Sequence, residues 1–189
     1  MTCNPKPLDA AAQRFASDAP EVLRAELGAR VGEQLLAAGM SLSTVESCTG
    51  GLISAAITSA AGSSRYFLEG HCTYSNESKV RCCGVDADVI AEKGAVSREV
   101  ATAMARGVRL ASGSDFALSS TGIAGPGGGS PHKPVGTVFI SLSHAGGETT
   151  RHLKLEGLSR GEVVHGSAMA ALTLLSDHLN GAEYGSDIF

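Results

Sequence analysis

A chain of 189 residues has room for one α/β domain of ordinary size, and its 43% hydrophobic residues are enough to bury a core. The formal net charge of −4 argues against nonspecific binding to nucleic acid or to an anionic membrane surface, which needs a basic face. The five cysteines are odd in number and contain no Cys-x-x-Cys pair, which argues against a disulfide framework and against a zinc site.

The sequence also bears on location and on metals. No segment approaches the roughly 18 apolar residues of a membrane helix, and the first 20 residues lack the apolar run of a signal peptide. The six histidines are scattered, without the spacing of a helical metal motif. We therefore expect a cytoplasmic protein that has no membrane partner, no metal and no cofactor.

Helices and strands are predicted to alternate along the chain after a tail over residues 1–20. Apolar residues recur at helical spacing over 21–38, and a short apolar run over 42–45 indicates a buried strand. Thr49 is predicted to cap a helix over 50–59. The next elements are a strand within 66–74, two short helices over 76–83 and 86–93, and a longer helix that Ser97 caps and that ends near residue 110.

The second half is predicted to contain three strands and a long helix. The strands cover residues 116–120, 135–143 and 149–155. Ser159 and Glu162 form a capping-box pattern, which predicts a helix from there to residue 179.

The interleaved order predicts a single-domain α/β fold, in which helices cover both faces of a mixed sheet. No internal repeat or linker interrupts residues 21–180, so we assign them to one domain and residues 181–189 to a second tail. Small α/β enzymes are often symmetric dimers, and we expect a homo-oligomer.

Two turns rich in small residues each follow an apolar run directly. Residues 46–51 read Glu-Ser-Cys-Thr-Gly-Gly, and residues 121–129 read Thr-Gly-Ile-Ala-Gly-Pro-Gly-Gly-Gly. Glycines let a ligand approach the main chain closely, and a helix after the first turn would offer its N–H groups to an anion. The two turns predict one nucleotide-sized pocket, lined by the hydroxyls of Ser47, Thr49 and Thr121.

Ser47 has two interpretations. Its hydroxyl can project into the pocket, with the following N–H groups as an oxyanion hole, or it can simply cap the helix. A serine is a weak nucleophile unless a base lies near it. Cys48 is a rival nucleophile of a thiol amidase in which Glu46 and Lys79 would assist, although neighbouring residues of a strand point to opposite faces.

Lys79 is a candidate for the missing base. It ends the polar segment 73–79, which reads Thr-Tyr-Ser-Asn-Glu-Ser-Lys after an expected strand. A lysine acts as a base only where burial or a nearby charge lowers its pKa. A solvated lysine that pairs with an acid such as Glu77 is the alternative, and the residues alone favour it.

Six blocks, taken in order, closely resemble the CinA C-terminal domain family. They are residues 46–51, 62–64 (Gly-Ser-Ser), 73–79, 94–97 (Gly-Ala-Val-Ser), 121–129 and 133–137 (Lys-Pro-Val-Gly-Thr). The resemblance extends from about residue 21 to 180. It implies an amidohydrolase that converts nicotinamide mononucleotide (NMN) to nicotinate mononucleotide and ammonia. Some relatives add an N-terminal nucleotide-pyrophosphatase-like domain, and the length of this chain implies the stand-alone form.

The resemblance also implies roles for particular residues. Ser47 matches the nucleophile, Lys79 the base that activates it, and Tyr74 a tyrosine that assists proton transfer. The positions implied to hold the substrate are Thr49, Gly50, Gly51, Ser97, Thr121, Gly122, Gly125, Gly127, Gly128 and Arg160.

One departure from the family pattern lies early in the last helix. Val164 and His165 stand where members of the family carry arginines, whereas Arg160 is retained. Weaker affinity for NMN would follow if the lost arginines bind phosphate. The alternative function is therefore a nucleotide-binding or regulatory module without turnover.

Overall fold

The computed structural model describes residues 20–181, and a mixed five-stranded sheet forms its centre. The strands lie in the order β2-β1-β3-β4-β5. Strand β1 pairs in parallel with β2 and β3, whereas β4 pairs antiparallel with β3 and β5. The carboxyl ends of β1, β2 and β3 therefore share one edge of the sheet. The bounds are β1 Leu42–Glu46, β2 Phe67–Cys72, β3 Phe116–Gly122, β4 Thr137–His144 and β5 Gly147–Lys154.

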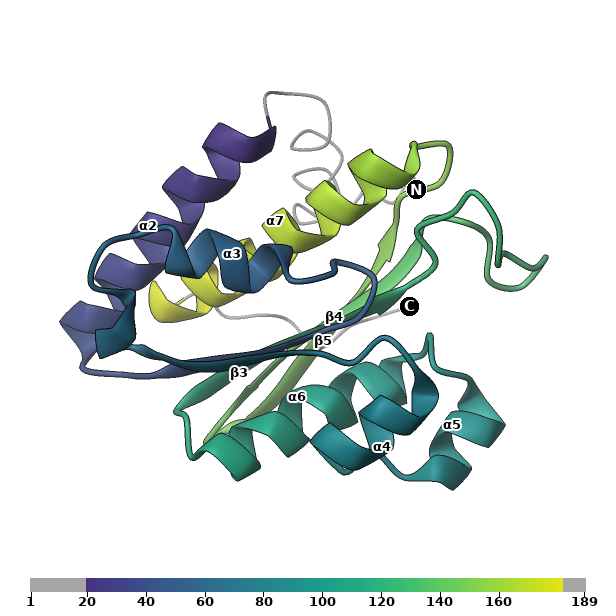
Figure 1. The fold of residues 1–189 in the computed structure, drawn as a ribbon, viewed down its shortest axis with the longest axis horizontal. Coiled ribbons are helices and arrows are strands. Elements are labelled where there is room, and N and C mark those ends of the chain that lie inside the picture. Colours follow the sequence, from purple (N-terminus) through teal and green to yellow (C-terminus); the bar gives the residue numbers. More distant parts are fainter. Residues whose placement is uncertain (1–19, 182–189) are drawn as a thin grey trace, which may run out of the picture.

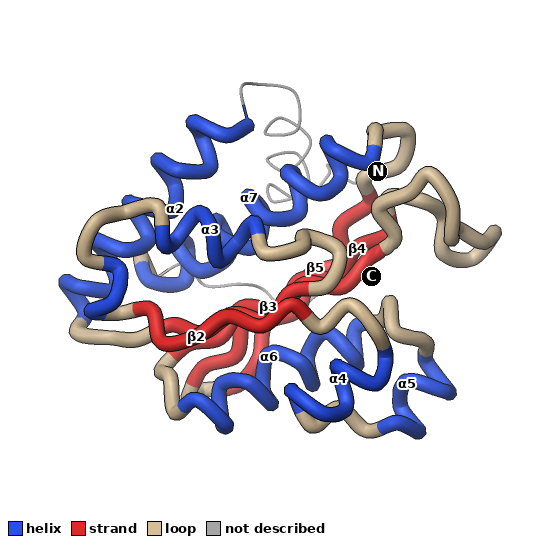
Figure 2. Tube along the Cα trace, viewed as in Figure 1, coloured by secondary structure: helices blue, strands red, loops and turns tan. Residues whose placement is uncertain are grey.

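Helices cover both faces of this sheet (Figures 1 and 2). On one face lie α2 (Pro20–Ala38), α3 (Leu52–Thr58) and α7 (Arg160–Leu179). On the other lie α4 (Asn76–Cys83), α5 (Ala87–Lys93) and α6 (Arg98–Ser112), and a 3-10 turn, η1 (Ser63–Arg65), precedes β2. The α/β fold with a mixed sheet between two helical layers is confirmed, whereas the predicted tails fall almost wholly outside the described residues.

Each helical layer encloses its own hydrophobic core. The larger core packs α2, α3 and α7 against the sheet, and the smaller one packs Val100, Met104 and Val108 of α6 against Val45 of β1. All of β1 is buried because the strand has a neighbour on each side and helices on both faces. None of the described helices is long and apolar enough to cross a membrane.

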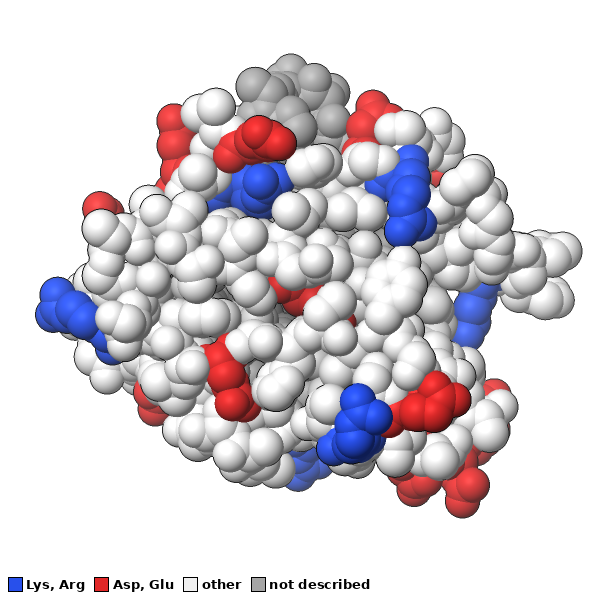
Figure 3. Space-filling view, in the orientation of Figure 1, with Lys and Arg blue, Asp and Glu red and all other residues white. Residues whose placement is uncertain are grey.

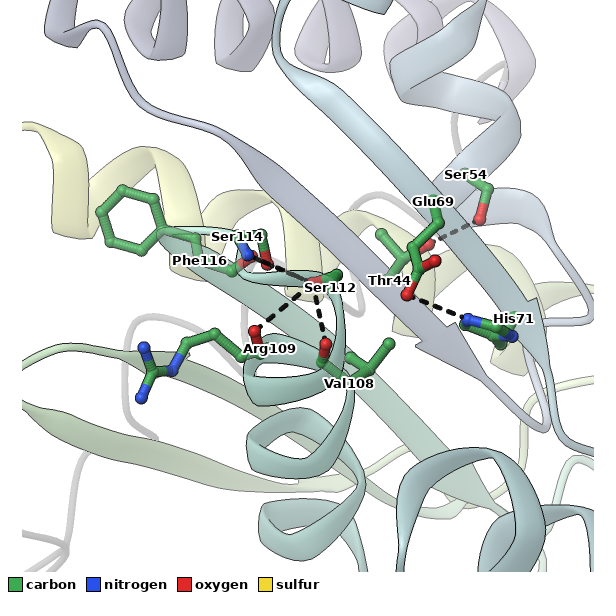
Figure 4. Close-up of polar contacts among 9 residues, drawn as sticks. All are labelled: Thr44, Ser54, Glu69, His71, Val108, Arg109, Ser112, Ser114 and Phe116. Carbon is green, nitrogen blue, oxygen red and sulfur yellow. Dashed lines mark hydrogen bonds and ion pairs between the residues drawn. The ribbon is translucent and has the colours of Figure 1, made fainter.

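Polar side chains set several helix ends where the sequence predicted them. Ser97 accepts a hydrogen bond from the Val100 N–H at the start of α6, and Ser159 with Glu162 forms the predicted capping box of α7. At the end of α6, Ser112 Oγ donates to the Val108 carbonyl and accepts from the Ser114 N–H, which turns the chain toward β3 (Figure 4).

Candidate active site

A cavity of about 270 Å³ opens where β1, β2 and β3 end. Open α/β sheets commonly bind ligands at the carboxyl ends of their parallel strands. Both small-residue turns contribute to the cavity lining, as predicted. Ser47 and Cys48 come from the first turn, and most of residues 121–128 line the cavity from the second turn. Tyr74 and Lys79, the segment of Ala95 and Val96 before α6, and Arg160 complete the lining.

Ser47 and Lys79 meet on one side of this cavity. The Nζ atom of Lys79 lies 3.1 Å from Ser47 Oγ and donates a 2.6 Å hydrogen bond to the carbonyl of Thr73. Only 1% of Lys79 is exposed, and this burial lowers the pKa of its amine. The interpretation of Lys79 as a solvated lysine is therefore wrong, and burial makes its protonated form less favourable than it is in water.

Backbone hydrogen bonds beyond the strand ends hold this pair together. The Ser47 N–H donates to the Ser120 carbonyl over 3.0 Å, and the Thr73 N–H donates to the Glu46 carbonyl over 2.7 Å. These bonds continue the sheet past its last regular pairs. They fix Ser47 close to Thr73, whose carbonyl accepts the hydrogen bond from Lys79.

Glu46 occupies the start of α3, where the sequence predicted an anion site. Its carboxylate accepts hydrogen bonds from the N–H groups of Gly51, Ile53 and Ser54. Helix α3 is also shorter than expected, and its N-cap is Gly51, with a φ of +103°. The prediction that Thr49 caps this helix is wrong, because Thr49 Oγ1 donates to Glu46 instead.

Cys48 lines the cavity beside Ser47 but is poorly suited to act as a nucleophile. Burial raises the pKa of its thiol to about 12. Only the thiolate is strongly nucleophilic, so a thiol of this pKa is almost entirely protonated near neutral pH. The geometry thus favours Ser47 over Cys48.

Arg160 connects two segments of the cavity lining, one containing Gly125 and the other containing Tyr74. Its guanidinium donates to the Gly125 carbonyl over 2.7 Å and to the Tyr74 hydroxyl over 3.0 Å. Tyr74 is 61% exposed, so its hydrogen bond with Arg160 is accessible to solvent. Deeper in the wall, Thr121 Oγ1 donates to the Ala95 carbonyl. Gly122, Gly125, Gly127 and Gly128, which the resemblance implies hold the substrate, also line the cavity.

Four residues predicted to hold the substrate lie outside the cavity lining. Thr49 is buried and bonds Glu46 and Ser120, while Gly50 and Gly51 complete the same turn. Ser97 caps α6 and donates to the Gly94 carbonyl. The sequence did not single out Ala95 and Val96, although both belong to the Gly-Ala-Val-Ser block over 94–97.

The departure from the family pattern also lies outside the cavity lining. Val164 packs against the larger core, and His165 Nδ1 lies 2.8 Å from an amino group of Arg24 on α2. The side chains of arginines at these positions would thus leave α7 on the side that faces α2. Among residues 20–181, no cluster of three His, Cys, Asp or Glu side chains could hold a metal ion.

The family model described as the CinA C-terminal domain matches residues 24–179. The chain belongs to this family. A CinA-like protein from Citrifermentans bemidjiense is 54% identical over 143 residues, which cover 76% of this chain and 33% of that protein. A CinA-like protein from Geobacter sp. strain M21 is 49% identical over 165 residues, or 87% of this chain and 38% of the relative. The chain thus spans about a third of the length of these relatives.

Solved structures from this family share the fold. The competence damage-inducible protein A from Klebsiella pneumoniae has a TM-score of 0.80 and 34% identity, with 85% of this chain and 99% of that chain covered. The competence/damage inducible protein CihA from Agrobacterium tumefaciens has a TM-score of 0.74 and 35% identity, and covers 95% of this chain and 99% of its own.

Proposed function

We propose that this domain hydrolyses the carboxamide of NMN to nicotinate mononucleotide and ammonia, the reaction that the CinA resemblance implies. The main support is the buried amine of Lys79, 3.1 Å from Ser47 Oγ in the cavity. A serine becomes nucleophilic when an adjacent base takes its proton. A lysine with a pKa lowered by burial supplies that base.

The proposed reaction begins as neutral Lys79 takes the Ser47 proton and Ser47 Oγ attacks the carboxamide carbon. The protonated amine of Lys79 then gives its proton to the amide nitrogen, the C–N bond breaks, and ammonia leaves. Water attacks the resulting ester on Ser47, with Lys79 again as base. Nicotinate mononucleotide is released and the Ser47 hydroxyl is restored.

The N–H group of Cys48, which lines the cavity beside Ser47, is the proposed oxyanion donor. Gly50 N–H donates to the Ser47 carbonyl, and Gly51 N–H donates to Glu46. Among the described residues, no backbone carbonyl accepts a hydrogen bond from the Cys48 N–H. This group directly follows the nucleophile, where a donor can stabilise the negative charge on the attacked carbonyl oxygen.

The proposed phosphate site lies across the cavity from Lys79. The cavity lining contains two basic residues, Lys79 and Arg160, and no acidic residue. With the carboxamide at Ser47, the phosphate is placed against Arg160 and the glycine-rich backbone of residues 125–128. Arginine binds phosphate through several parallel hydrogen bonds.

Tyr74 remains a proposed assistant in proton transfer. In the described structure its hydroxyl bonds Arg160, and no hydrogen bond joins it to Ser47 or Lys79. Assistance would require the phenol to reach the leaving nitrogen once substrate binds. Tyr74→Phe separates the roles, since a fall in kcat supports proton transfer and a rise in KM alone supports a binding role.

The proposed partner is thus a small nucleotide, with no nucleic acid or membrane surface. On the face shown in Figure 3, basic and acidic side chains are scattered singly or in mixed groups. The homo-oligomer and the cytoplasmic location remain predictions, and light scattering of the purified chain tests the first.

Ammonia release from NMN tests the proposal directly. We expect turnover by the parent chain and a loss of at least about 10⁴-fold in Ser47→Ala, since removing a serine nucleophile has effects of this order or larger. Ser112→Ala, at the end of α6, is the matched control and should keep full activity.

Each alternative function predicts a different result. Full turnover by Ser47→Ala, together with inactivation by iodoacetamide, would support the thiol amidase based on Cys48. Binding of NMN in calorimetry without ammonia release would support the regulatory module. The departure at Val164 and His165 gives that module less support than the sequence suggested, because neither residue lines the cavity.

A further inference from the structure

Glu46 is fully buried at the end of β1, one residue before Ser47. A buried carboxylate is costly unless a cation or several hydrogen bonds compensate its charge. The ion pairs of the described residues do not include Glu46. Its charge is therefore balanced by hydrogen bonds.

Five hydrogen bonds converge on the two carboxylate oxygens. Oε2 accepts from Thr49 Oγ1 over 2.6 Å, from Gly51 N over 3.0 Å and from Ile53 N over 3.1 Å. Oε1 accepts from the N–H and the hydroxyl of Ser54 over 2.8 and 2.7 Å. All five donors belong to the first turn or to the start of α3.

Two further hydroxyl contacts connect this cluster to the sheet. Ser54 Oγ lies 2.7 Å from Thr44 Oγ1 on β1 (Figure 4), and Thr49 Oγ1 lies 2.7 Å from Ser120 Oγ on β3. Because Ser54 and Thr49 use their hydroxyl protons on Glu46, Thr44 and Ser120 are the donors in these contacts. The first turn and the start of α3 are thus hydrogen-bonded to both β1 and β3.

We propose that Glu46 is a positioning residue for the proposed reaction: its carboxylate fixes the turn that sets the directions of the Ser47 hydroxyl and of the Cys48 N–H group. Gly50 and Gly51 have φ values of +62° and +103°, and glycines give a free turn many conformations. The inference rests on the function proposed above.

An ionised carboxylate suits this position better than its closest neutral analogue. Both oxygens of a carboxylate only accept hydrogen bonds, whereas the amide group of glutamine would direct its own NH₂ at some of the donors. Lys79, in contrast, is held by α4 and by the Thr73 carbonyl. A change of the Glu46 side chain should therefore move the nucleophile and the oxyanion donor more than the base, because the hydrogen bonds of this carboxylate do not include Lys79.

The first experiment compares Glu46→Gln with the parent in ammonia release from NMN. We expect kcat to fall about 10²-fold, because displacements near 1 Å cost about that much. KM should stay unchanged, because Arg160 and the glycine-rich wall do not contact Glu46. Since the burial of Lys79 is retained, the acid limb of the pH profile should not move.

Asp115→Asn is the matched control. Asp115 accepts hydrogen bonds from the Ser41 N–H and hydroxyl, which lie at the other ends of the strands. This variant loses a bonded carboxylate without a contact to the cavity, and it should lower stability but keep kcat. The proposal would be overturned if Glu46→Gln had the same kcat as the parent. It would also be overturned if the fall in kcat were no larger than the fall in the fraction of folded protein.

A second experiment returns a carboxylate to the vacated space. In Glu46→Ala, formate should raise both the melting temperature and kcat in a saturable way, whereas neutral formamide should do neither. The same titration of Asp115→Ala should leave kcat unchanged. Stabilisation by formate without recovery of kcat would overturn the positioning role.

The failure of the proposed function remains distinguishable from the failure of this inference. If the parent does not hydrolyse NMN, the labelling rate of Ser47 by a fluorophosphonate decides the question. Slower labelling of Glu46→Gln than of Asp115→Asn would support the positioning role. Equal rates would exclude it.

Discussion

The turns after β1 and after β3 have similar compositions, yet the structure uses them differently. In residues 46–51 the N–H groups of the two glycines bond atoms of Ser47 and Glu46, so the turn is closed on itself. In residues 121–129, four glycines line the cavity directly: Gly122, Gly125, Gly127 and Gly128. Glycine content alone therefore does not identify a ligand-binding turn. What matters is whether a neighbouring side chain already occupies its N–H groups.

The second turn is fixed by side chains from outside it. Arg160 binds the Gly125 carbonyl, and Lys133 Nζ donates to the carbonyls of Lys93 and Val96 over 2.7 Å each. Gly127 and Gly128, which lie between these anchors in the sequence, line the cavity. The comparison suggests that the first turn is built for one reacting hydroxyl and the second for recognition of a ligand.

Replacement of Lys79 tests the reacting side and should have a larger effect than the changes at Arg160 and Thr49 described below. Lys79→Met should lower kcat about 10²- to 10⁴-fold, the usual contribution of a general base, while the fold is retained. Lys93→Met is the control, since Lys93 is exposed and pairs with Glu92. Unchanged ammonia release by Lys79→Met would contradict the assignment of the base.

The pH dependence of the parent tests the same group. Lys79 is active when neutral, so kcat/KM should rise with pH through the pKa of Lys79. Burial lowers this pKa, so the midpoint should lie below the ordinary lysine value of about 10.4. The unfolded chain binds this proton more tightly, so the parent should also lose stability as pH falls from the ordinary value to the lowered one. Lys79→Met should lack that loss.

Replacement of Arg160 tests the recognition side and should have a smaller effect. Arg160→Met should raise KM for NMN about 10- to 100-fold, because a hydrogen bond to a charged group contributes about 1.5–3 kcal/mol. Nicotinamide riboside has no phosphate, so its KM should change far less. Arg24→Met is the control, because Arg24 contacts His165 outside the cavity lining. A fall in kcat for both substrates would instead assign Arg160 to the reaction itself.

Local patterns predicted the fold well because each element carries its own signals. The spacing of apolar residues and the caps Ser97 and Ser159 mark the helices in the sequence itself. The pairing of Ser47 and Lys79, which lie 32 positions apart, required the family resemblance. The residues alone favoured a solvated Lys79, because burial depends on how α4 packs.

The role of Glu46 was missed for a related physical reason. Thr49 has the residue type and the place of an N-cap, whereas capping rules do not consider a side chain at the end of the preceding strand. Only the tertiary arrangement shows that the carboxylate reaches Ile53 and Ser54. The same arrangement turns the Thr49 hydroxyl away from the cavity.

Replacement of Thr49 tests whether the first turn has a structural role, in contrast to ligand recognition by the second turn. It should have the smallest kinetic effect. Thr49→Val leaves Glu46 and Ser120 each without one buried hydrogen bond, so the free energy of unfolding should fall by about 1–3 kcal/mol. KM for NMN should remain that of the parent, because Thr49 does not line the cavity. Denaturant unfolding and steady-state kinetics measure the two quantities, with Thr102→Val on α6 as the control. A tenfold rise in KM at unchanged stability would instead place substrate against Thr49, and the first turn would then recognise its ligand as the second does.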